Sequence, residues 1–158
     1  FRLQTLSLNE LLCDTVNGLK MPGDDRSVVV SLPSQPVLVH ADSGKLRQAF
    51  NNVLSNAYKY SPNGGEIRLV LSAEVAEQPH LCAIQVSDQG IGMSSEQLAR
   101  VFERFYRADS SGKIPGTGLG MSVVKEIIEL HGGYVTVDSR FGAGTTVTVY
   151  LPLIGETK

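Results

Sequence analysis

A regular series of amide side chains marks the stretch RQAFNNVLSNAYKYS, residues 47–61. Gln48, Asn52 and Asn56 follow one another at intervals of four residues, and Lys59 lies one turn further along. At 100° per residue these side chains share one side of a predicted helix. The other side carries apolar residues: Leu46, Phe50, Val53, Leu54 and Ala57. We call Gln48, Asn52 and Asn56 the amide series.

The amide series is costly for a helix, because asparagine has a lower helix propensity than the Glu, Lys and Arg of most solvated faces. Amide oxygens are neutral, hard ligands of the kind that magnesium accepts beside phosphate oxygens, and a lysine can contact the same phosphates. The series therefore favours a nucleotide–magnesium site. A polar face that is merely solvated is the alternative.

The segment VSDQGIGM, residues 86–93, ends a predicted strand at Asp88 and continues with Gly90 and Gly92. A carboxylate at a strand end can accept a hydrogen bond from the exocyclic amine of adenine, whereas guanine presents an acceptor there. An ordinary Asp-Gly turn is the alternative.

A second glycine-rich segment, GKIPGTGLGM, leads directly into a predicted helix through Gly116, Gly118 and Gly120. Its backbone N–H groups and the positive end of the helix could face phosphates. The spacing fits neither G-x-G-x-x-G nor the P-loop, which requires a Lys-Ser/Thr pair.

The elements that must position these residues follow from periodicity and turn signals. In chain order we expect a helix at 7–19, strands at 28–32 and 37–40, a helix capped by Asp42 or Ser43, a hairpin over 66–88, a broken helix at 94–106, a loop at 110–116, a helix at 119–131 ended by Gly132, and a hairpin over 134–152. This order predicts an α/β (α+β) two-layer sandwich with a mixed, largely antiparallel sheet and helices packed on one face.

Length and composition suit one soluble globular domain, with 158 residues, 42% hydrophobic residues and a net charge of -2. The mild acidity gives no electrostatic reason to expect nucleic acid as a partner. Cys13 and Cys82 lie in apolar stretches, so we predict two buried, reduced thiols and a cytosolic compartment. No apolar run is long enough to span a bilayer. A chain that opens on Phe1 is expected to be part of a longer protein.

Taken together, the motifs resemble the catalytic and ATP-binding domain of two-component sensor histidine kinases, in the GHKL superfamily that includes the Hsp90 chaperones, type II topoisomerases and MutL. The matching segments, in family order, are NNVLSNAYKYS (N box), DQGIGM (first glycine box), FERFYR (F box), GTGLGM (second glycine box) and GAGTT (last glycine box). They all lie within residues 47–146. The resemblance implies the Bergerat ATP-binding fold, with ATP and Mg²⁺ as cofactors.

The resemblance also implies roles for single residues. Asn52 would hold the magnesium ion, and Asn56 and Lys59 would lie at the phosphates. Arg107 resembles a lid arginine that contacts the terminal phosphates, so Asn52, Lys59 and Arg107 are the expected catalytic residues. The remaining nucleotide contacts expected from the motifs are Tyr60, Asp88, Gly90, Gly92, Met93, Gly116, Thr117, Gly118, Leu119, Gly120 and Thr146.

The implied function is to bind Mg-ATP and donate its γ-phosphate to a histidine on a separate dimerisation and phosphoacceptor domain. His40, His80 and His131 lack the context of a phosphoacceptor and are expected to be structural. ATPases of the superfamily place a glutamate where this chain has Gln48, which cannot take a proton, so hydrolysis should be slow. The alternatives are a hydrolysing GHKL-type ATPase, a degenerate nucleotide-binding docking module and a serine kinase.

The domain expectations follow from the same resemblance. Residues 1–6 would be the tail of a linker from the missing upstream domain, 7–154 the ATP-binding domain and 155–158 a C-terminal tail. The expected partners are ATP, the upstream phosphoacceptor domain and, through the full-length kinase, a response regulator. We expect a monomeric fragment without nucleic acid or direct membrane contact, in the cytoplasmic part of a parent that family analogy suggests is membrane-anchored.

Overall fold

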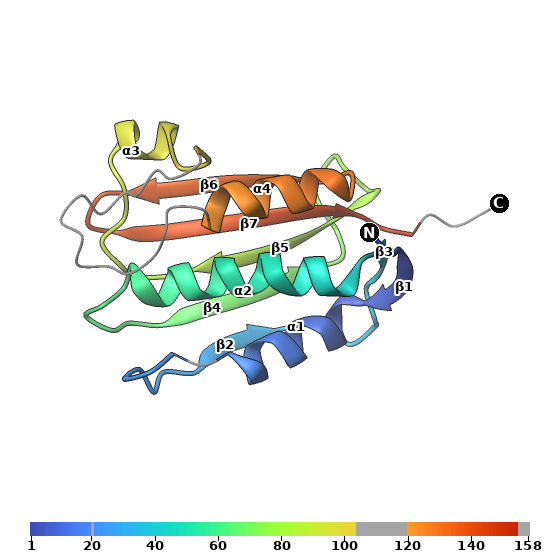
Figure 1. Ribbon diagram of the computed structural model, residues 1–158, viewed down its shortest axis with the longest axis horizontal. Helices are drawn as coiled ribbons and strands as arrows, with labels where there is room; N and C mark the ends of the chain where they lie inside the picture. Colours follow the sequence, from blue (N-terminus) through green and yellow to red (C-terminus); the bar gives the residue numbers. More distant parts are fainter. Residues whose placement is uncertain (20, 104–119, 155–158) are drawn as a thin grey trace.

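The computed structural model of the protein describes residues 1–19, 21–103 and 120–154 (Figure 1). The elements are, in chain order, β1 (Gln4–Ser7), α1 (Leu8–Gly18), β2 (Val28–Ser31), β3 (Leu38–Ala41), α2 (Ser43–Lys59), β4 (Ile67–Ser72), β5 (Leu81–Ser87), α3 (Ser95–Ala99), α4 (Gly120–Leu130), β6 (Tyr134–Arg140) and β7 (Gly144–Pro152). No helix within these ranges is both long and apolar enough to cross a membrane.

Five strands form the main sheet in the order β2-β4-β5-β7-β6. β2 pairs with β4 in parallel, and the other three pairings are antiparallel. The helices α1, α2 and α4 lie together on one face of this sheet (Figure 1). The predicted two-layer sandwich with a mixed, largely antiparallel sheet is therefore confirmed.

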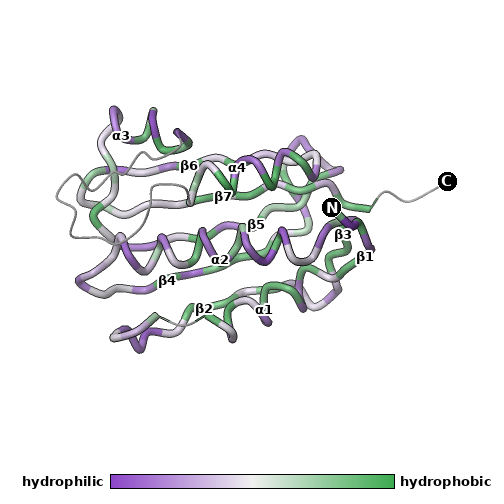
Figure 2. Tube along the Cα trace, in the orientation of Figure 1, coloured by the Kyte–Doolittle hydropathy of each residue, from purple (hydrophilic) through white to green (hydrophobic). Residues whose placement is uncertain are grey.

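The core fills the space between the sheet and α2 and α4. Along β4, Ile67, Leu69 and Leu71 are buried while Arg68 between them is exposed, as the two-residue period of a strand requires. The apolar side of α2 predicted from the sequence is also buried, at Leu46, Phe50, Val53, Leu54 and Ala57. Figure 2 shows hydrophilic and hydrophobic positions alternating along α2, so one side of this helix remains available for polar chemistry.

A second, two-stranded sheet was not predicted. β1 pairs antiparallel with β3, with Gln4 opposite Ala41 and Ser7 opposite Leu38. β3 was predicted as a strand, but it lies in this small sheet and not in the main one. The Ser7 hydroxyl accepts a hydrogen bond from the Glu10 amide (3.4 Å), so Ser7 is the N-cap of α1.

Capping side chains fix the two helices that border the candidate site. Asp42 caps α2, because its carboxylate accepts a hydrogen bond from the Lys45 amide at 3.0 Å. The Asp42 amide in turn donates to Nε2 of His131 (3.1 Å), whose Nδ1 lies 2.7 Å from the Ile127 carbonyl oxygen. His131 thus ties the end of α4 to the start of α2, in agreement with its predicted structural role.

The two cysteines differ in their surroundings. Cys82 is fully buried in β5, but Cys13 is exposed, so the prediction of two buried thiols was wrong for Cys13. The buried side of α1 is formed by Leu8, Leu11, Leu12 and Thr15. At 100° per residue Cys13 points away from the direction that these four residues share.

Candidate functional site

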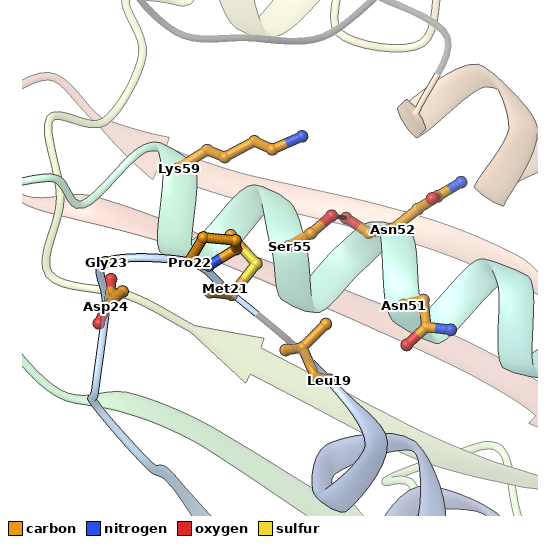
Figure 3. A pocket seen from close by; sticks show the side chains of 9 residues that line it. All are labelled: Leu19, Met21, Pro22, Gly23, Asp24, Asn51, Asn52, Ser55 and Lys59. Carbon is orange, nitrogen blue, oxygen red and sulfur yellow. Dashed lines mark hydrogen bonds between the residues drawn. The ribbon is translucent and has the colours of Figure 1, made fainter.

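The amide series lies on the side of α2 that faces away from the sheet. Gln48 is exposed, and Asn52, Asn56 and Lys59 are partly buried. Figure 3 shows the side chains of Asn52 and Lys59 extending on one side of α2 and that of Asn51 extending on another. The helix therefore presents an amide and an ammonium group to the same region, as the sequence predicted.

The start of α4 borders this region. A Cβ added to Gly120 would lie 3.4 Å from Nδ2 of Asn56, at ordinary van der Waals distance. The backbone at the N-terminus of α4 therefore lies beside the amide series. An amide, a nearby helix N-terminus and an ammonium group together form a polar surface that could bind anions.

Asp88 directly follows β5, next to the first residues of β7. Its amide donates to the Thr145 carbonyl (2.9 Å), and its Oδ1 accepts a hydrogen bond from the Gly90 amide (2.8 Å). Burial raises the pKa of the Asp88 carboxyl, while hydrogen bonds from the backbone of Gly90 and Thr145 and the charge of Arg26 act to lower it. A carboxylate in such a place can discriminate between donors and acceptors on a bound ring.

The 88–92 loop is packed between α2 and the β6–β7 turn. A Cβ on Gly90 would lie 1.9 Å from the carbonyl oxygen of Tyr60, and a Cβ on Gly92 would lie 1.9 Å from that of Arg140. Gly92 also has a positive φ of 66°. The Ile91 amide donates to the Tyr60 carbonyl at 3.0 Å. These two glycines are therefore required by close backbone contacts and not only by a turn.

The other predicted nucleotide contacts in this part of the chain lie around the same loop. Tyr60 is partly buried at the C-cap of α2. Met93 is buried, and its amide donates to the Ser139 hydroxyl at 2.8 Å. Thr146 is partly buried near the start of β7, opposite Ser87 of β5. The fold thus brings the ends of β5, α2 and β7 together beside the amide series.

Several predicted site residues lie outside the described residues. They are Arg107, Gly116, Thr117, Gly118 and Leu119. Phe102, at the start of the F box, is described and packs, partly buried, against the core. The roles at the phosphates that the sequence suggests for Arg107 and for residues 116–119 remain predictions.

An open depression of about 690 Å³ lies between α2 and the segment that precedes β2. Its lining residues are Leu19, Met21, Pro22, Gly23, Asp24, Asn51, Asn52, Ser55 and Lys59 (Figure 3). The Ser55 hydroxyl donates to the Asn52 carbonyl at 3.2 Å, so it is bound to the helix backbone. Leu19 and the segment 21–24 therefore line one side of the depression, opposite the helix that carries the amide series.

Sequence reasoning missed Arg26. Its guanidinium contacts Asp24 and the last turn of α2, and its charge acts on Asp88. The sequence DDRS looks like an ordinary charged loop, and no local pattern indicates that its arginine turns inward.

The donor set agrees with the cofactors that the sequence analysis expected. Asn52 and Asn56 supply neutral amide oxygens that can act as metal ligands, and Lys59 supplies a cation. Asp88 supplies a hydrogen-bond acceptor beside a loop in which a Cβ would fill the available space. Magnesium accepts such oxygens together with phosphate oxygens and water. These residues are therefore chemically suited to a magnesium-bound adenine nucleotide.

Comparison with known proteins gives the same answer. Residues 41–155 match the family described as histidine kinase-, DNA gyrase B-, and HSP90-like ATPase. The chain is 43% identical over 124 residues to the sensor histidine kinase WalK of Bacillus subtilis, covering 77% of this chain and 20% of that protein. It is 35% identical over 152 residues to the heme sensor protein HssS of Staphylococcus saprophyticus, covering 96% of this chain and 32% of that protein. The chain thus spans less than a third of these two relatives.

Solved structures agree in fold. The mycobacterial sensor histidine kinase MprB superimposes with a TM-score of 0.81 at 30% identity, covering 96% of this chain and 98% of that one. The histidine kinase domain of the E. coli osmosensor EnvZ gives a TM-score of 0.73 at 26% identity, covering 100% of this chain and 93% of that one. Both this chain and these relatives carry the two-layer fold described above. The chain belongs to the family of histidine kinase-, DNA gyrase B- and HSP90-like ATPases, and within it to the catalytic domains of sensor histidine kinases.

Proposed function

We propose that the chain binds Mg-ATP and positions its γ-phosphate for transfer to a histidine on a separate dimerisation and phosphoacceptor domain. The observation that carries this proposal is the meeting of the Asp88 loop, the end of α2 and the amide series on one side of the sheet. Such an arrangement gives one end of the site an acceptor for adenine and the other end ligands for phosphate and metal.

In this proposal each group has a distinct role. Asp88 accepts a hydrogen bond from the adenine amine, and Gly90 and Gly92 let the backbone approach the base. Asn52 holds the metal ion, which when bound neutralises phosphate charge, while Asn56 and Lys59 contact the phosphates. Arg107, outside the described residues, is the proposed contact to the terminal phosphate. Positioning and charge neutralisation then account for catalysis, since the attacking histidine is proposed to lie on another domain.

The expected partners complete the proposal. The acceptor histidine belongs to an upstream domain, and the phosphoryl group then passes to a response regulator through the full-length kinase. HssS is named a heme sensor protein. That name describes the relative, and we propose no sensed signal for this chain. We place this domain in the cytoplasm, as a monomer, with residues 1–6 as the end of the connecting segment and 155–158 as a tail.

Calorimetric titration with a non-hydrolysable ATP analogue tests the proposal. Binding should require magnesium and should be weakened at least about tenfold by Asn52→Ala, because a metal ligand is lost. Asn51→Ala is the matched control, since the neighbouring amide extends on another side of the same helix (Figure 3). A guanine analogue should compete poorly. Equal losses from both substitutions, or no binding by the folded protein, would contradict the proposed site.

Phosphotransfer needs its own test. Incubating the domain and radiolabelled ATP with a separately expressed histidine-containing hairpin domain should label that hairpin and not this chain. Labelling of this chain alone would contradict the assignment of donor and acceptor. Steady turnover without any acceptor would support the hydrolysing alternative instead.

A further inference from the structure

Arg26 lies in the segment between α1 and β2 and makes a fork of contacts with its guanidinium group. Nε and Nη2 donate to the Asp24 carboxylate at 3.0 and 2.6 Å. Nη1 donates to the Ser61 hydroxyl at 3.0 Å and to the Gly65 carbonyl at 3.2 Å. Nη2 also donates to the Tyr58 carbonyl at 3.3 Å. With 18% of its side chain exposed, Arg26 is held on several sides.

The contacts with the end of α2 are reciprocal. The Tyr58 hydroxyl donates to the Arg26 carbonyl at 2.7 Å, and the guanidinium carbon lies 5.2 Å from the centre of the Tyr58 ring. Ser61 is 1% exposed, and its hydroxyl donates to the Ala57 carbonyl at 2.6 Å while it accepts from Arg26. Arg26 therefore fixes both ends of the turn that contains Tyr60.

Tyr60 connects this turn to the 88–92 loop. Its carbonyl oxygen accepts the Ile91 amide at 3.0 Å and lies against Gly90. A second connection runs through Gly65, whose carbonyl accepts from Arg26 and whose α-carbon region packs against the Gln89 side chain. A shift of the α2 turn must therefore move the loop that follows Asp88.

The charge of Arg26 acts on the same loop. Burial raises the pKa of the Asp88 carboxyl, and the charge of Arg26 lowers it by less than the backbone hydrogen bonds of Gly90 and Thr145 do. The pKa of Arg26 is raised chiefly by its hydrogen bond to Asp24, with a small contribution from Asp88. The cation therefore favours the ionised carboxylate, which is the form that accepts a hydrogen bond from an adenine amine.

We propose that Arg26 is a positioning residue for the adenine end of the site: through the last turn of α2 it fixes the backbone contact between Tyr60 and Ile91 on which the 88–92 loop is built. This inference rests on the proposed function for its binding consequence, but its structural half stands without nucleotide. It predicts that Arg26 controls base selectivity although it does not touch the base.

Amide hydrogen exchange tests the structural half in the nucleotide-free protein. Arg26→Gln should speed exchange at the Ile91 amide by about tenfold, as expected for losing hydrogen bonds to a charged group, and should change the core amide of Ile84 much less. Arg26→Lys keeps the charge but not the fork, so an intermediate effect is expected. If Arg26→Gln does not fold, the same exchange rates can be measured in Arg26→Lys instead.

Base selectivity tests the binding half. The affinity ratio between non-hydrolysable ATP and ITP analogues, which differ in the exocyclic amine, should fall by about tenfold in Arg26→Gln. In an Asp88→Asn background the same substitution should leave the ratio unchanged, because the acceptor has already been altered. Arg68→Gln is the matched control, since Arg68 of β4 forms an exposed ion pair with Glu66 (2.7 Å), the residue before that strand.

The possible outcomes separate the two proposals. If the wild type binds neither analogue, the proposed function fails, and exchange at Ile91 still decides the structural half. If the wild type binds but Arg26→Gln keeps both the selectivity and the Ile91 protection, the inference is overturned. Equal acceleration at Ile91 and Ile84 would likewise overturn it, since Arg26 would then stabilise the whole fold only.

Discussion

The Tyr60 carbonyl oxygen and the Ile91 amide form a 3.0 Å hydrogen bond that joins the end of α2 to the loop after β5. The same oxygen lies where a side chain on Gly90 would begin, 1.9 Å from an added Cβ. The helix that carries the amide series and the loop that carries Asp88 are therefore in direct backbone contact. We therefore expect a displacement at one end of the site to shift the other through this packed backbone.

Gly90→Ala should disrupt this contact. A Cβ cannot approach a carbonyl oxygen so closely, so either the loop or the α2 turn must move, at a cost of roughly 1–3 kcal/mol. We expect a lower free energy of unfolding in urea and a large loss of affinity for an ATP analogue. Calorimetry on the folded fraction separates the two effects.

Gly18→Ala is the matched control for that substitution. Gly18 is the last residue of α1, and nothing lies within 4 Å of an added Cβ. Since alanine reduces the conformational freedom of the unfolded chain, the control should be neutral or stabilising by up to about 1 kcal/mol. Similar destabilisation by both substitutions would show that the close contact at Gly90 is not the cause.

Asp88→Asn should stabilise the nucleotide-free protein near pH 7 while weakening adenine binding. The folded-state pKa of Asp88 is raised, chiefly by burial, so keeping it ionised at neutral pH costs free energy that a neutral amide avoids. Urea unfolding of both proteins measures the gain. A less stable variant that binds the ATP analogue normally would contradict the assignment of Asp88.

The difference in stability between the wild type and Asp88→Asn should depend on pH, and the direction of that dependence follows from the pKa of Asp88. Because the pKa is raised on folding, the stability that Asp88 contributes is fully present below its ordinary value of 3.8 and is lost as the pH rises through the raised value. The advantage of Asp88→Asn should therefore shrink as the solution is acidified. The affinity of the wild type for adenine should fall over the same acid range. The protonated carboxyl carries an O–H donor and is a poorer hydrogen-bond acceptor for the adenine amine.

Much of this site could be predicted from sequence because its signals are local. The period of α2 places Asn52 and Asn56 opposite Phe50 and Leu54, and burial follows that period. A strand that ends at an aspartate followed by spaced glycines is likewise a local pattern. The hairpins were predictable for the same reason, since each pairs neighbouring segments.

The features that were missed depend on contacts between distant segments. β1 is a strand of four residues whose partner, β3, lies more than thirty positions away, and its sequence resembles a linker. Arg26 acts through Ser61 and Gly65, 35 and 39 positions away. The wrong prediction that Cys13 is buried was avoidable, because the helical period of α1 already places this residue opposite the buried side.

Thiol reactivity should follow the difference between the two cysteines. Cys13 is exposed, whereas burial raises the pKa of the Cys82 thiol to about 11. In the native protein a chromogenic disulfide reagent should modify one thiol quickly, and in denaturant it should modify two. Cys13→Ser is expected to abolish the fast reaction. A fast phase that survives this substitution would contradict the burial of Cys82.

His131→Ala should destabilise the protein more than substitution of either of the other two histidines. Its ring accepts the Asp42 amide and bonds the Ile127 carbonyl, so the neutral form with a proton on Nδ1 satisfies both partners. Removing the ring leaves both groups without that partner, at a cost of roughly 1–3 kcal/mol. The free energy of unfolding in urea measures this loss, with His40→Ala as the control because His40 is exposed on β3. If both substitutions cost the same, the link between α4 and α2 through His131 does not contribute to stability, and the packing of these two helices alone must align the site.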